Sequence, residues 1–301
     1  MILRNFRDLL YLFIGTLQSI FYLLIWRPDV VFVKGGFVGL PVGIAAGLLR
    51  RPLVTHDSDA IPGLTNKLLS KFVTIHAVGM PIENYRYPKN KMQYTGIPIR
   101  QEFIDLSVKQ NNTIFGFNDE SKPLVLIVGG SLGAVRLNNA VLAGLSDLVA
   151  LNINIFWITG SGQYKDIQQK LGQRYTNRII IKPYSDETAE LMAGSSIVIS
   201  RAGATSLAEL AILSKPTIIV PNPYLTGGHQ IKNANIYSEA NAAIVINEAE
   251  LSDPNILVES INNLLKNDKL KSELSKNINK FAIKNGADNI VTVITKIAGA
   301  K

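Results

Sequence analysis

Residues 123–134 read PLVLIVGGSLGA, and this stretch decides the fold. The apolar run 123–128 has no polar interruption, which predicts a strand buried on both faces of a parallel sheet. A glycine-rich turn at 129–134 follows, and the residues after it, to about Val149, are predicted as a helix. A strand, a tight turn and a helix in this order indicate an α/β domain.

The same alternation of strands and helices continues on both sides of this stretch. Downstream, we predict strands at 153–159, 178–182, 197–200, 217–220 and 243–246, and helices at 188–193, 206–213, 230–240 and from about 253 onward. Upstream, we predict strands at 30–33, 52–55, 72–77 and 93–95, and helices at 39–49 and 64–71. Two doubly wound α/β domains account for this pattern.

A polar stretch separates the two predicted domains. Residues 101–121 include KQNNT at 109–113, a composition typical of a linker. We therefore predict a first domain at 1–100, a linker at 101–121 and a second domain at 122–283. The last helical stretch, 284–301, is expected to pack back on the first domain.

The composition excludes several classes of protein. The chain has 301 residues, of which 47% are hydrophobic, so it is long and apolar enough to bury the cores of two domains. It has no cysteine, which excludes a disulfide scaffold and any cysteine-ligated zinc or iron–sulfur site. Because His56, His76 and His229 are its only histidines, we expect no metal site and no cofactor.

The positive charge is concentrated in the first third of the chain. Residues 1–100 hold twelve basic and five acidic side chains, although the net charge of the whole chain is only +8. The same third holds the uncharged run LLYLFIGTLQSIFYLLIW at 9–26. A basic and strongly apolar region favours an anionic membrane surface as partner. Nucleic acid is not expected, since aromatic residues are not interleaved with the basic ones.

Three interpretations of the run 9–26 remain open. A signal peptide is excluded, because Trp26-Arg27-Pro28-Asp29 is no cleavage site. The run approaches the roughly 20 residues that a membrane-spanning helix needs, but the polar residues in GTLQS at 15–19 weaken its centre. We favour a docked helix that touches a membrane, over a true span or a misread start of the chain.

The turn at 129–134 is the strongest candidate for a ligand site. Its glycines, Gly130 and Gly133 among them, allow a ligand to approach the backbone, and the following helix presents free N–H groups to an anion. Ser131 adds a hydroxyl donor. These features predict a bound diphosphate, although the turn matches neither the Walker loop nor the G-x-G-x-x-G pattern. The alternative is a tight connection with no ligand.

Two further turns have the same character. In SRAGATS at 200–206, Gly203 and Ala204 permit another close approach to phosphate, and Glu209 on the next helix is placed to accept hydrogen bonds from ribose hydroxyls. Glu209 has an alternative role, which is to complement the positive end of its helix.

In the third turn, GGHQ at 227–230, His229 and Gln230 offer donors and acceptors to sugar hydroxyls, although a lone histidine is usually structural. One anionic ligand rich in hydroxyl groups would explain all three turns, because they follow parallel strands that share one edge of the sheet.

The first domain offers weaker candidates. His56 beside Asp57 has the chemistry of a general base or of a polar anchor, and the alternative is a loop histidine among solvated acids. The sequence Asp57-Ser58-Asp59 also has the spacing of a metal–diphosphate motif, which we keep as a weak alternative. Arg100 lies at the crossover between the domains, where it is expected to face the cleft between them.

On six motifs the chain resembles a known family. They are GGSLGA with Asn138, SRAGATSLAEL, GGHQIKNA, PDVVFVKGGFVGLPVGIAA, HDSDAIPGLTNK and GIPIR, and together they cover nearly the whole chain. The family is MurG, whose members transfer GlcNAc from UDP-GlcNAc to the undecaprenyl-linked lipid I on the cytoplasmic face of the bacterial membrane. The resemblance implies a GT-B glycosyltransferase fold, with two Rossmann-like domains and an intervening cleft.

The resemblance also implies roles for individual residues. Ser131 and the glycines beside it would bind the diphosphate of the donor, UDP-GlcNAc. Glu209 would bind the ribose of the donor. Arg100 and the backbone near Ser185 would recognise uracil. His229 and Gln230 would contact GlcNAc or the adjacent phosphate. A lipid-linked acceptor and an anionic membrane surface would meet the first domain.

The sequence departs from the family pattern at its start. The family's GGTGGH-type loop is absent, Ile97 replaces an asparagine, and HDSD at 56–59 stands where the family has HEQN. We therefore expect an incomplete first domain, explained by truncation, by a misplaced start site, or by a second chain that supplies the segment. His56 with Asp57 is then the only visible candidate for the base. The functional alternatives are an active lipid I transferase, the donor-binding subunit of a two-chain enzyme, and a glycolipid transferase with another acceptor.

Overall fold

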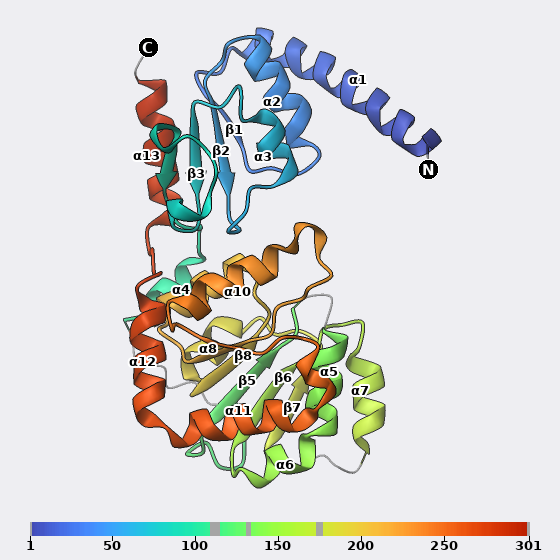
Figure 1. Ribbon diagram of the computed structural model, residues 1–301, viewed down its shortest axis with the longest axis vertical. Coiled ribbons are helices and arrows are strands. Elements are labelled where there is room, and N and C mark those ends of the chain that lie inside the picture. The colour runs from blue at the N-terminus through green and yellow to red at the C-terminus, as the bar shows by residue number, and fades with distance from the viewer. Residues whose placement is uncertain (1, 109–114, 131–133, 173–176, 300–301) are drawn as a thin grey trace. The chain divides into compact units, whose positions relative to one another are not determined.

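A computed structural model describes residues 2–108, 115–130, 134–172 and 177–299, with the side chains of 2–6 and 226 left out. The chain forms two compact units (Figure 1). Unit 1 comprises Met1–Pro98 and Asn285–Lys301, and unit 2 comprises Ile99–Lys284. Both are parallel α/β structures, so the predicted fold class is confirmed.

Unit 1 is built on a four-stranded parallel sheet with the order β1-β2-β3-β4. The central strand β2 is buried along its whole length, as expected for a strand covered on both faces. The strands are β1 Val31–Val33, β2 Leu53–Asp57, β3 Ile75–Val78 and β4 Met92–Tyr94. The helices are α1 Ile2–Trp26, α2 Gly39–Leu48, α3 Leu64–Leu69 and α13 Gly286–Ala298, with short 3-10 turns at Ile82–Asn84 and Lys89–Lys91.

Two helices of unit 1, α1 and α13, come from opposite ends of the sequence. Helix α1 packs on α2, where Leu23 is buried and Gly15 faces Pro41. Helix α13 packs on β3 at the other side of the sheet. There, Asn289 donates a hydrogen bond to the Thr95 carbonyl (3.0 Å), and a side chain at Gly286 would lie only 2.6 Å from the Ile97 carbonyl oxygen. The residues 286–298 are therefore an integral part of unit 1.

Unit 2 is built on a six-stranded parallel sheet with the order β10-β9-β8-β5-β6-β7. The chain starts in the middle at β5, moves outward through β6 and β7, and returns to β8 on the other side of β5. This order creates a topological switch point between β5 and β8. The strands are β5 Leu124–Val128, β6 Asn154–Ile158, β7 Ile179–Lys182, β8 Ile197–Ser200, β9 Thr217–Ile219 and β10 Ile244–Val245.

Helices cover this sheet and enclose a continuous core. The core includes the fully buried Trp157 on β6 and the apolar faces of α5 and α11, which pack against each other. The helices are α4 Gln101–Leu106, α5 Val135–Ala143, α6 Leu145–Ala150, α7 Tyr164–Leu171, α8 Thr188–Gly194, α9 Ala204–Ile212, α10 His229–Glu239, α11 Pro254–Lys266 and α12 Asp268–Asn279, with 3-10 turns η4 Thr226–Gly228 and η5 Glu250–Ser252.

The structure differs from the predicted elements at three places. The helix expected to run to about Val149 is two helices, α5 and α6, which meet at Gly144, where a Cβ would lie 2.7 Å from the Val258 side chain. Helix α7 was not predicted. The stretch 101–121, interpreted as a linker, begins with α4, whose Phe103 is fully buried as α4 packs on α8 and α9. Burial of this apolar face explains why the polar stretch starts with a helix.

Candidate functional site

The candidate site lies at the carboxyl edge of the sheet in unit 2. Strands β5, β8 and β9 are neighbours in this sheet, and each is followed by one of the three glycine-containing turns. The turns after β5 and β8 flank the switch point, where open α/β sheets bind their ligands. The topology therefore brings together the three turns that the sequence places far apart.

The turn after β5 is fixed at its start by a backbone hydrogen bond. The Gly129 amide donates to the Ile158 carbonyl on the neighbouring strand (3.1 Å), and Gly130 has a φ of +83°. Among the residues that the structure describes, none would lie within 4 Å of a Cβ at Gly130, although the positive φ disfavours any other residue. Ser131 and Gly133 lie outside the described residues, and their roles stay predictions.

Asn138 fixes the helix that follows this turn. Its side-chain amide donates to the Thr159 carbonyl (2.9 Å) and to Gln163 Oε1 (2.7 Å), and its oxygen accepts from the Trp157 indole (2.9 Å). Asn138 is fully buried, and these bonds join α5 to the end of β6 and, through the partly buried bond to Gln163, to the start of α7. The motif asparagine therefore stabilises the position of α5.

The turn after β8 leads directly into α9. Gly203 has extended backbone at the start of this helix, and Ala204, its first residue, is buried. Small residues at both positions leave the first amides of α9 accessible to a ligand, as an anion site at a helix N-terminus requires. Asn233 on α10 donates to the Ala202 carbonyl (2.9 Å), which joins this turn to the helix after β9.

Glu209 on α9 carries the most strongly perturbed carboxyl group of unit 2. Only 8% of the residue is exposed, and burial raises its pKa from 4.5 to about 7, although the positive charge of Arg100 opposes this rise. In the described part of the chain no group donates a hydrogen bond to this carboxylate. A buried acceptor without a donor is suited to bind ligand hydroxyls.

Arg100 and Glu209 influence each other electrostatically, so the structure brings these two predicted residues together. The Arg100 guanidinium pairs with Glu102 (2.6 Å) and lies over the Phe103 ring, 5.0 Å from its centroid. About half of its side chain remains exposed. A planar, half-exposed guanidinium of this kind is available to a nucleobase.

Ser185 follows a strand that does not pair with β5, β8 or β9. It follows β7, the outermost strand on its side of the sheet. Its hydroxyl accepts from the Glu187 amide (3.2 Å), and its carbonyl accepts from the Thr188 hydroxyl (2.7 Å). These bonds shape the turn before α8, and the predicted role of the Ser185 backbone toward uracil stays a prediction.

The turn after β9 holds His229 and Gln230 at the start of α10. Gly227 and Gly228 both have positive φ, 76° and 66°, so the chain bends sharply before the helix. The side-chain oxygen of Gln230 accepts from the Asn222 amide at the other end of the loop (2.8 Å). The Gln230 amide is therefore held in one orientation.

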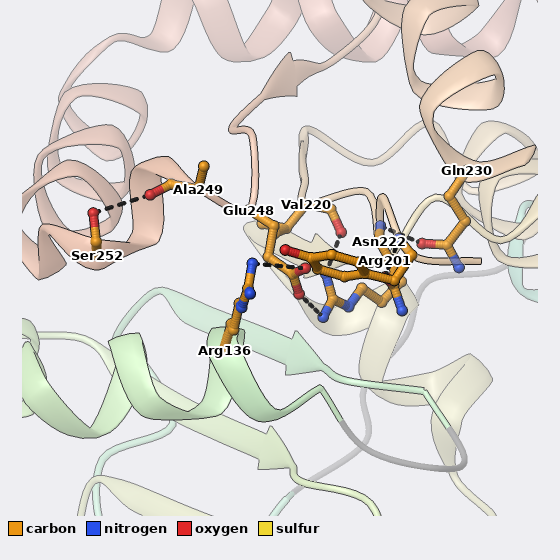
Figure 2. A network of polar contacts seen from close by, with 9 residues as sticks. Arg136, Arg201, Val220, Asn222, Gln230, Glu248, Ala249 and Ser252 are labelled. Carbon is orange, nitrogen blue, oxygen red and sulfur yellow. Dashed lines mark hydrogen bonds and ion pairs between the residues drawn. The ribbon is translucent and has the colours of Figure 1, made fainter. Parts of the chain in front are cut away.

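An ion-pair network that sequence reasoning missed crosses this edge of the sheet (Figure 2). Glu248, which follows β10 and is buried, accepts from Arg201 (2.5 Å), and its second oxygen lies 3.8 Å from Arg136 on α5. Arg201 also donates to the Val220 carbonyl at the end of β9 (3.1 Å). The only signal in the sequence was an arginine inside the motif SRAGATS, since nothing marked Arg136 or Glu248.

His56 in unit 1 has both ring nitrogens engaged. Nε2 donates to the Gly96 carbonyl (3.0 Å), and Nδ1 accepts from the Lys34 ammonium (2.7 Å). Burial and the nearby positive charge of Lys34 lower the pKa of His56 to about 4. This arrangement supports an anchor that joins the ends of β1, β2 and β4, and the role of His56 as base stays a prediction.

Asp57 is similarly occupied. Its carboxylate accepts from the Gly63 amide (2.9 Å), the Asn66 side chain (2.9 Å) and the Tyr87 hydroxyl (3.0 Å). Burial nevertheless raises the pKa of Asp57, because the loss of hydration of the charged carboxylate outweighs the lowering of the pKa by these three hydrogen bonds. The protein's own donors thus surround the carboxylate that the sequence offered as partner of the base or as part of a metal motif.

Helix α1 exposes an unusual apolar surface. Within the described residues, Arg7–Trp26 is the segment long and apolar enough to cross a membrane, with a mean hydropathy of 1.8. Leu9, Phe13 and Phe21 are each about 60% exposed, and a groove of about 610 Å³ lies between α1 and the α2 residues Ile44 and Leu48. Large apolar side chains exposed together on one surface mark an interaction site.

Comparisons with known proteins give one result. Residues 124–290 match the profile of the glycosyltransferase family 28 C-terminal domain, and residues 1–78 match that of the N-terminal domain. The chain is 37% identical over 297 residues to a Clostridium tetani protein and 36% identical over 274 residues to an Acetivibrio thermocellus protein. Both are named UDP-N-acetylglucosamine–N-acetylmuramyl-(pentapeptide) pyrophosphoryl-undecaprenol N-acetylglucosamine transferase.

These matches extend over most of each chain. The alignment with the Clostridium protein covers 98% of this chain and 80% of that protein. The alignment with the Acetivibrio protein covers 90% of this chain and 74% of that protein. Among solved structures, Acinetobacter baumannii MurG matches with a TM-score of 0.76 at 26% identity, covering 93% of this chain and 78% of that one. A Neisseria meningitidis UDP-GlcNAc 2-epimerase bound to UDP-GlcNAc matches with a TM-score of 0.67 at 15% identity, over 94% and 80%, which shows a shared fold.

Proposed function

The chain belongs to the MurG family of glycosyltransferases, and from this we propose how its residues divide the work of the reaction. The enzyme uses UDP-GlcNAc and transfers GlcNAc to the lipid-linked muramyl-pentapeptide acceptor, lipid I, in peptidoglycan synthesis. The observation that carries the assignment of the donor to unit 2 is the switch point between β5 and β8, flanked by two glycine turns and Glu209.

The donor residues follow from the chemistry of each turn. The turn after β5 and the N-terminus of α9 bind the diphosphate through backbone amides and their helix dipoles. Glu209 binds the ribose hydroxyls, and Arg100 with the backbone near Ser185 recognises uracil. His229 and Gln230 contact GlcNAc, with the Gln230 side-chain N–H groups turned to the ligand because its oxygen is held by Asn222.

The reaction is an inverting transfer. A hydroxyl of the acceptor sugar attacks the anomeric carbon, the bond to the diphosphate breaks, and UDP leaves with the bonding electrons. The helix N-termini at the carboxyl edge of the sheet stabilise the negative charge that develops on the leaving diphosphate. The acceptor hydroxyl loses its proton in the same step, and His56 with Asp57 is the candidate pair named from the sequence for taking it.

Unit 1 offers a cation for the acceptor. Lys34 donates to His56 and to the Ser58 hydroxyl (2.7 Å each), and the carboxylates of Asp57 and Asp59 attract it electrostatically. It lies at the carboxyl edge of the sheet, ahead of Gly35 and Gly36, which both have positive φ. We assign Lys34 to the negatively charged diphosphate of the lipid-linked acceptor.

Helix α1 is proposed as the contact with the membrane, so that the enzyme is peripheral and lies on the cytoplasmic face, where UDP-GlcNAc is available. Its exposed leucine and phenylalanine side chains supply the apolar contact, and the excess of basic residues in 1–100 supplies the attraction to anionic lipid. The packing of α1 on α2 supports a helix that lies on the membrane rather than crossing it.

The test is transfer by the purified chain. We expect release of UDP when the chain meets UDP-GlcNAc and a lipid I acceptor in anionic vesicles. Binding of UDP without turnover, relieved by a second chain, would instead support the donor-binding subunit. Turnover only with other glycolipids would support the related transferase. A chain that binds no UDP-GlcNAc at all would contradict the donor site.

A further inference from the structure

The loop between β9 and α10 is largely exposed, although it ends in two of the proposed sugar-binding residues. Tyr224 is 71% exposed and Leu225 is 44% exposed. Gly227 and Gly228, both with positive φ, form a sharp bend directly before α10. A loop of this kind needs contacts with the body of unit 2 if it is to hold His229 and Gln230 in one place.

Arg136 supplies such a contact. Its guanidinium lies over the Tyr224 ring, 4.7 Å from the centroid, and Nη1 lies 3.8 Å from Glu248 Oε2. Glu248 is itself held by Arg201, which also binds the Val220 carbonyl just before the loop. Figure 2 shows Arg136 reaching from α5 toward the Glu248 carboxylate, with Arg201 on the other side of it.

The position of Arg136 needs an explanation of its own. It is the second residue of α5, where the helix dipole repels a positive charge, and the first turn of α5 contains no acidic residue. Glu248 compensates this charge from another element, which fixes the direction of the arginine. Half of the side chain is exposed, so the guanidinium face remains available to the Tyr224 ring.

Two hydrogen bonds link Tyr224 to Gln230 through Asn222. The backbone amide of Tyr224 donates to the Asn222 side-chain oxygen (2.9 Å), and the backbone amide of Asn222 donates to the side-chain oxygen of Gln230 (2.8 Å). Arg136, Tyr224, Asn222 and Gln230 therefore form one chain of contacts from α5 to the start of α10.

We propose that Arg136 and Tyr224 are positioning residues that clamp the loop 221–228, so that Gln230 and His229 meet the sugar of UDP-GlcNAc. The inference rests on the proposed function, because it takes the sugar to lie at the start of α10. The clamp acts on the sugar end of the donor and leaves the nucleotide end, bound by other turns, unaffected.

The test compares binding of UDP-GlcNAc with binding of UDP by calorimetry. We expect Tyr224→Leu and Arg136→Met to weaken UDP-GlcNAc roughly two- to fivefold, the size of an exposed cation–π contact, and to leave UDP unchanged. Tyr224→Phe keeps the ring and should restore wild-type affinity. Arg178→Met, on the opposite edge of the same sheet, is the matched control for loss of an arginine.

A double-mutant cycle gives the sharpest readout. If the two residues form one clamp, the double variant loses no more affinity than either single variant, and KM for UDP-GlcNAc rises while kcat with saturating donor stays near wild type. Additive losses, equal losses for UDP and UDP-GlcNAc, or no loss would each overturn the clamp. Wild-type chain that fails to bind UDP-GlcNAc would reject the proposed function itself, which the same titration reveals first.

Discussion

Single residues decide what the candidate site binds, and Glu209 does so by its protonation. Its carboxyl is nearly buried, with a pKa of about 7. The charged form accepts hydrogen bonds from both ribose hydroxyls, whereas the protonated form must donate one of its own. Since an acid with a raised pKa is neutral below that pKa, donor binding should strengthen as the pH rises through 7.

We predict about tenfold weaker binding of UDP-GlcNAc by the wild type at pH 6 than at pH 8. The Glu209→Gln variant should bind roughly 10- to 100-fold more weakly than the wild type at pH 8 and show no such pH dependence. Calorimetry measures both, and UDP-GlcNAc is the right ligand because its diphosphate does not titrate in this range. A pH dependence that persists in the glutamine variant would remove Glu209 from the ribose site.

Asn138 shows how a motif residue can serve the site without touching a ligand. Two of its three hydrogen bonds are buried, so Asn138→Ala leaves the Trp157 indole and the Thr159 carbonyl without partners. We predict a loss of roughly 2–4 kcal/mol in the free energy of unfolding, measured by urea denaturation. The neighbouring, exposed Asn139→Ala is the control, and similar losses for both would contradict the assigned role.

At this scale the sequence could predict types of residue but not their partners. Glu209 was recognisable because it follows a glycine turn by a fixed spacing. The pairing of Arg136 with Glu248 was not recognisable, because it joins elements more than one hundred residues apart and depends on the order of the strands. His56 was proposed from its acidic neighbours, whereas its partners in the structure are Lys34 and Gly96, from other strand ends.

Among the elements, α1 has two apolar faces with different tasks. Leu12, Ile20 and Leu23 pack on α2, whereas Phe13 and Phe21 point away from the unit's core. We predict that Phe13→Glu with Phe21→Glu reduces binding to anionic vesicles at least tenfold, since it removes two large apolar contacts and adds repulsion.

Cosedimentation with vesicles measures this loss, and calorimetry should show unchanged binding of UDP. The control is Val291→Glu, which adds a charge to an exposed position on α13 of the same unit. Wild-type vesicle binding by the double glutamate variant would show that α1 is not the docking surface.

Helix α13 offers a second prediction for an element. A Cβ at Gly286 would lie 2.6 Å from the Ile97 carbonyl oxygen. This clash is with a backbone atom, which cannot avoid it by a change of rotamer as a side chain could. We predict that Gly286→Val destabilises unit 1 by about 2–4 kcal/mol, seen as faster amide exchange in β2 and β3. Gly299→Val, beyond the last residue of α13, has more room and should leave exchange unchanged. Equal effects would contradict close packing of α13.

Strands were predictable at their correct places because buried parallel strands are short and uniformly apolar, as in β5 and β8. The boundaries of the helices were harder to predict from the sequence. Gly144 looked like an ordinary helix residue, and only the approach of Val258 on α11 explains the break between α5 and α6. Helix α7 has the polar sequence YKDIQQKL with two buried residues, Ile167 and Leu171, which is too little apolar signal to recognise.

For the whole molecule, the division into two units predicts where a ligand stabilises the fold. At one hundred times its dissociation constant, UDP-GlcNAc should stabilise unit 2 by about 2.7 kcal/mol. Hydrogen exchange should then slow in β5 and β8 and remain unchanged in β2 and β3. Equal protection of both sheets would contradict a donor site confined to unit 2.

The overall architecture could be predicted from the sequence, but the order of the strands could not. Alternating strands and helices predict parallel sheets, and the family motifs predict two of them. The return of β8 to the other side of β5 leaves no local mark, because it depends on long-range packing of the sheet. This return creates the switch point that gathers the glycine turns.

The place of α13 has a consequence for the order in which the molecule is made. Unit 2 is one continuous stretch, Ile99–Lys284, so it can fold on the ribosome as soon as that stretch has emerged. Unit 1 must wait for residues 286–298, which are translated after all of unit 2. During this interval the part of unit 1 on which α13 packs, around β3 and Ile97, lacks its partner, so a translating chain should carry a finished donor domain and an unfinished acceptor domain.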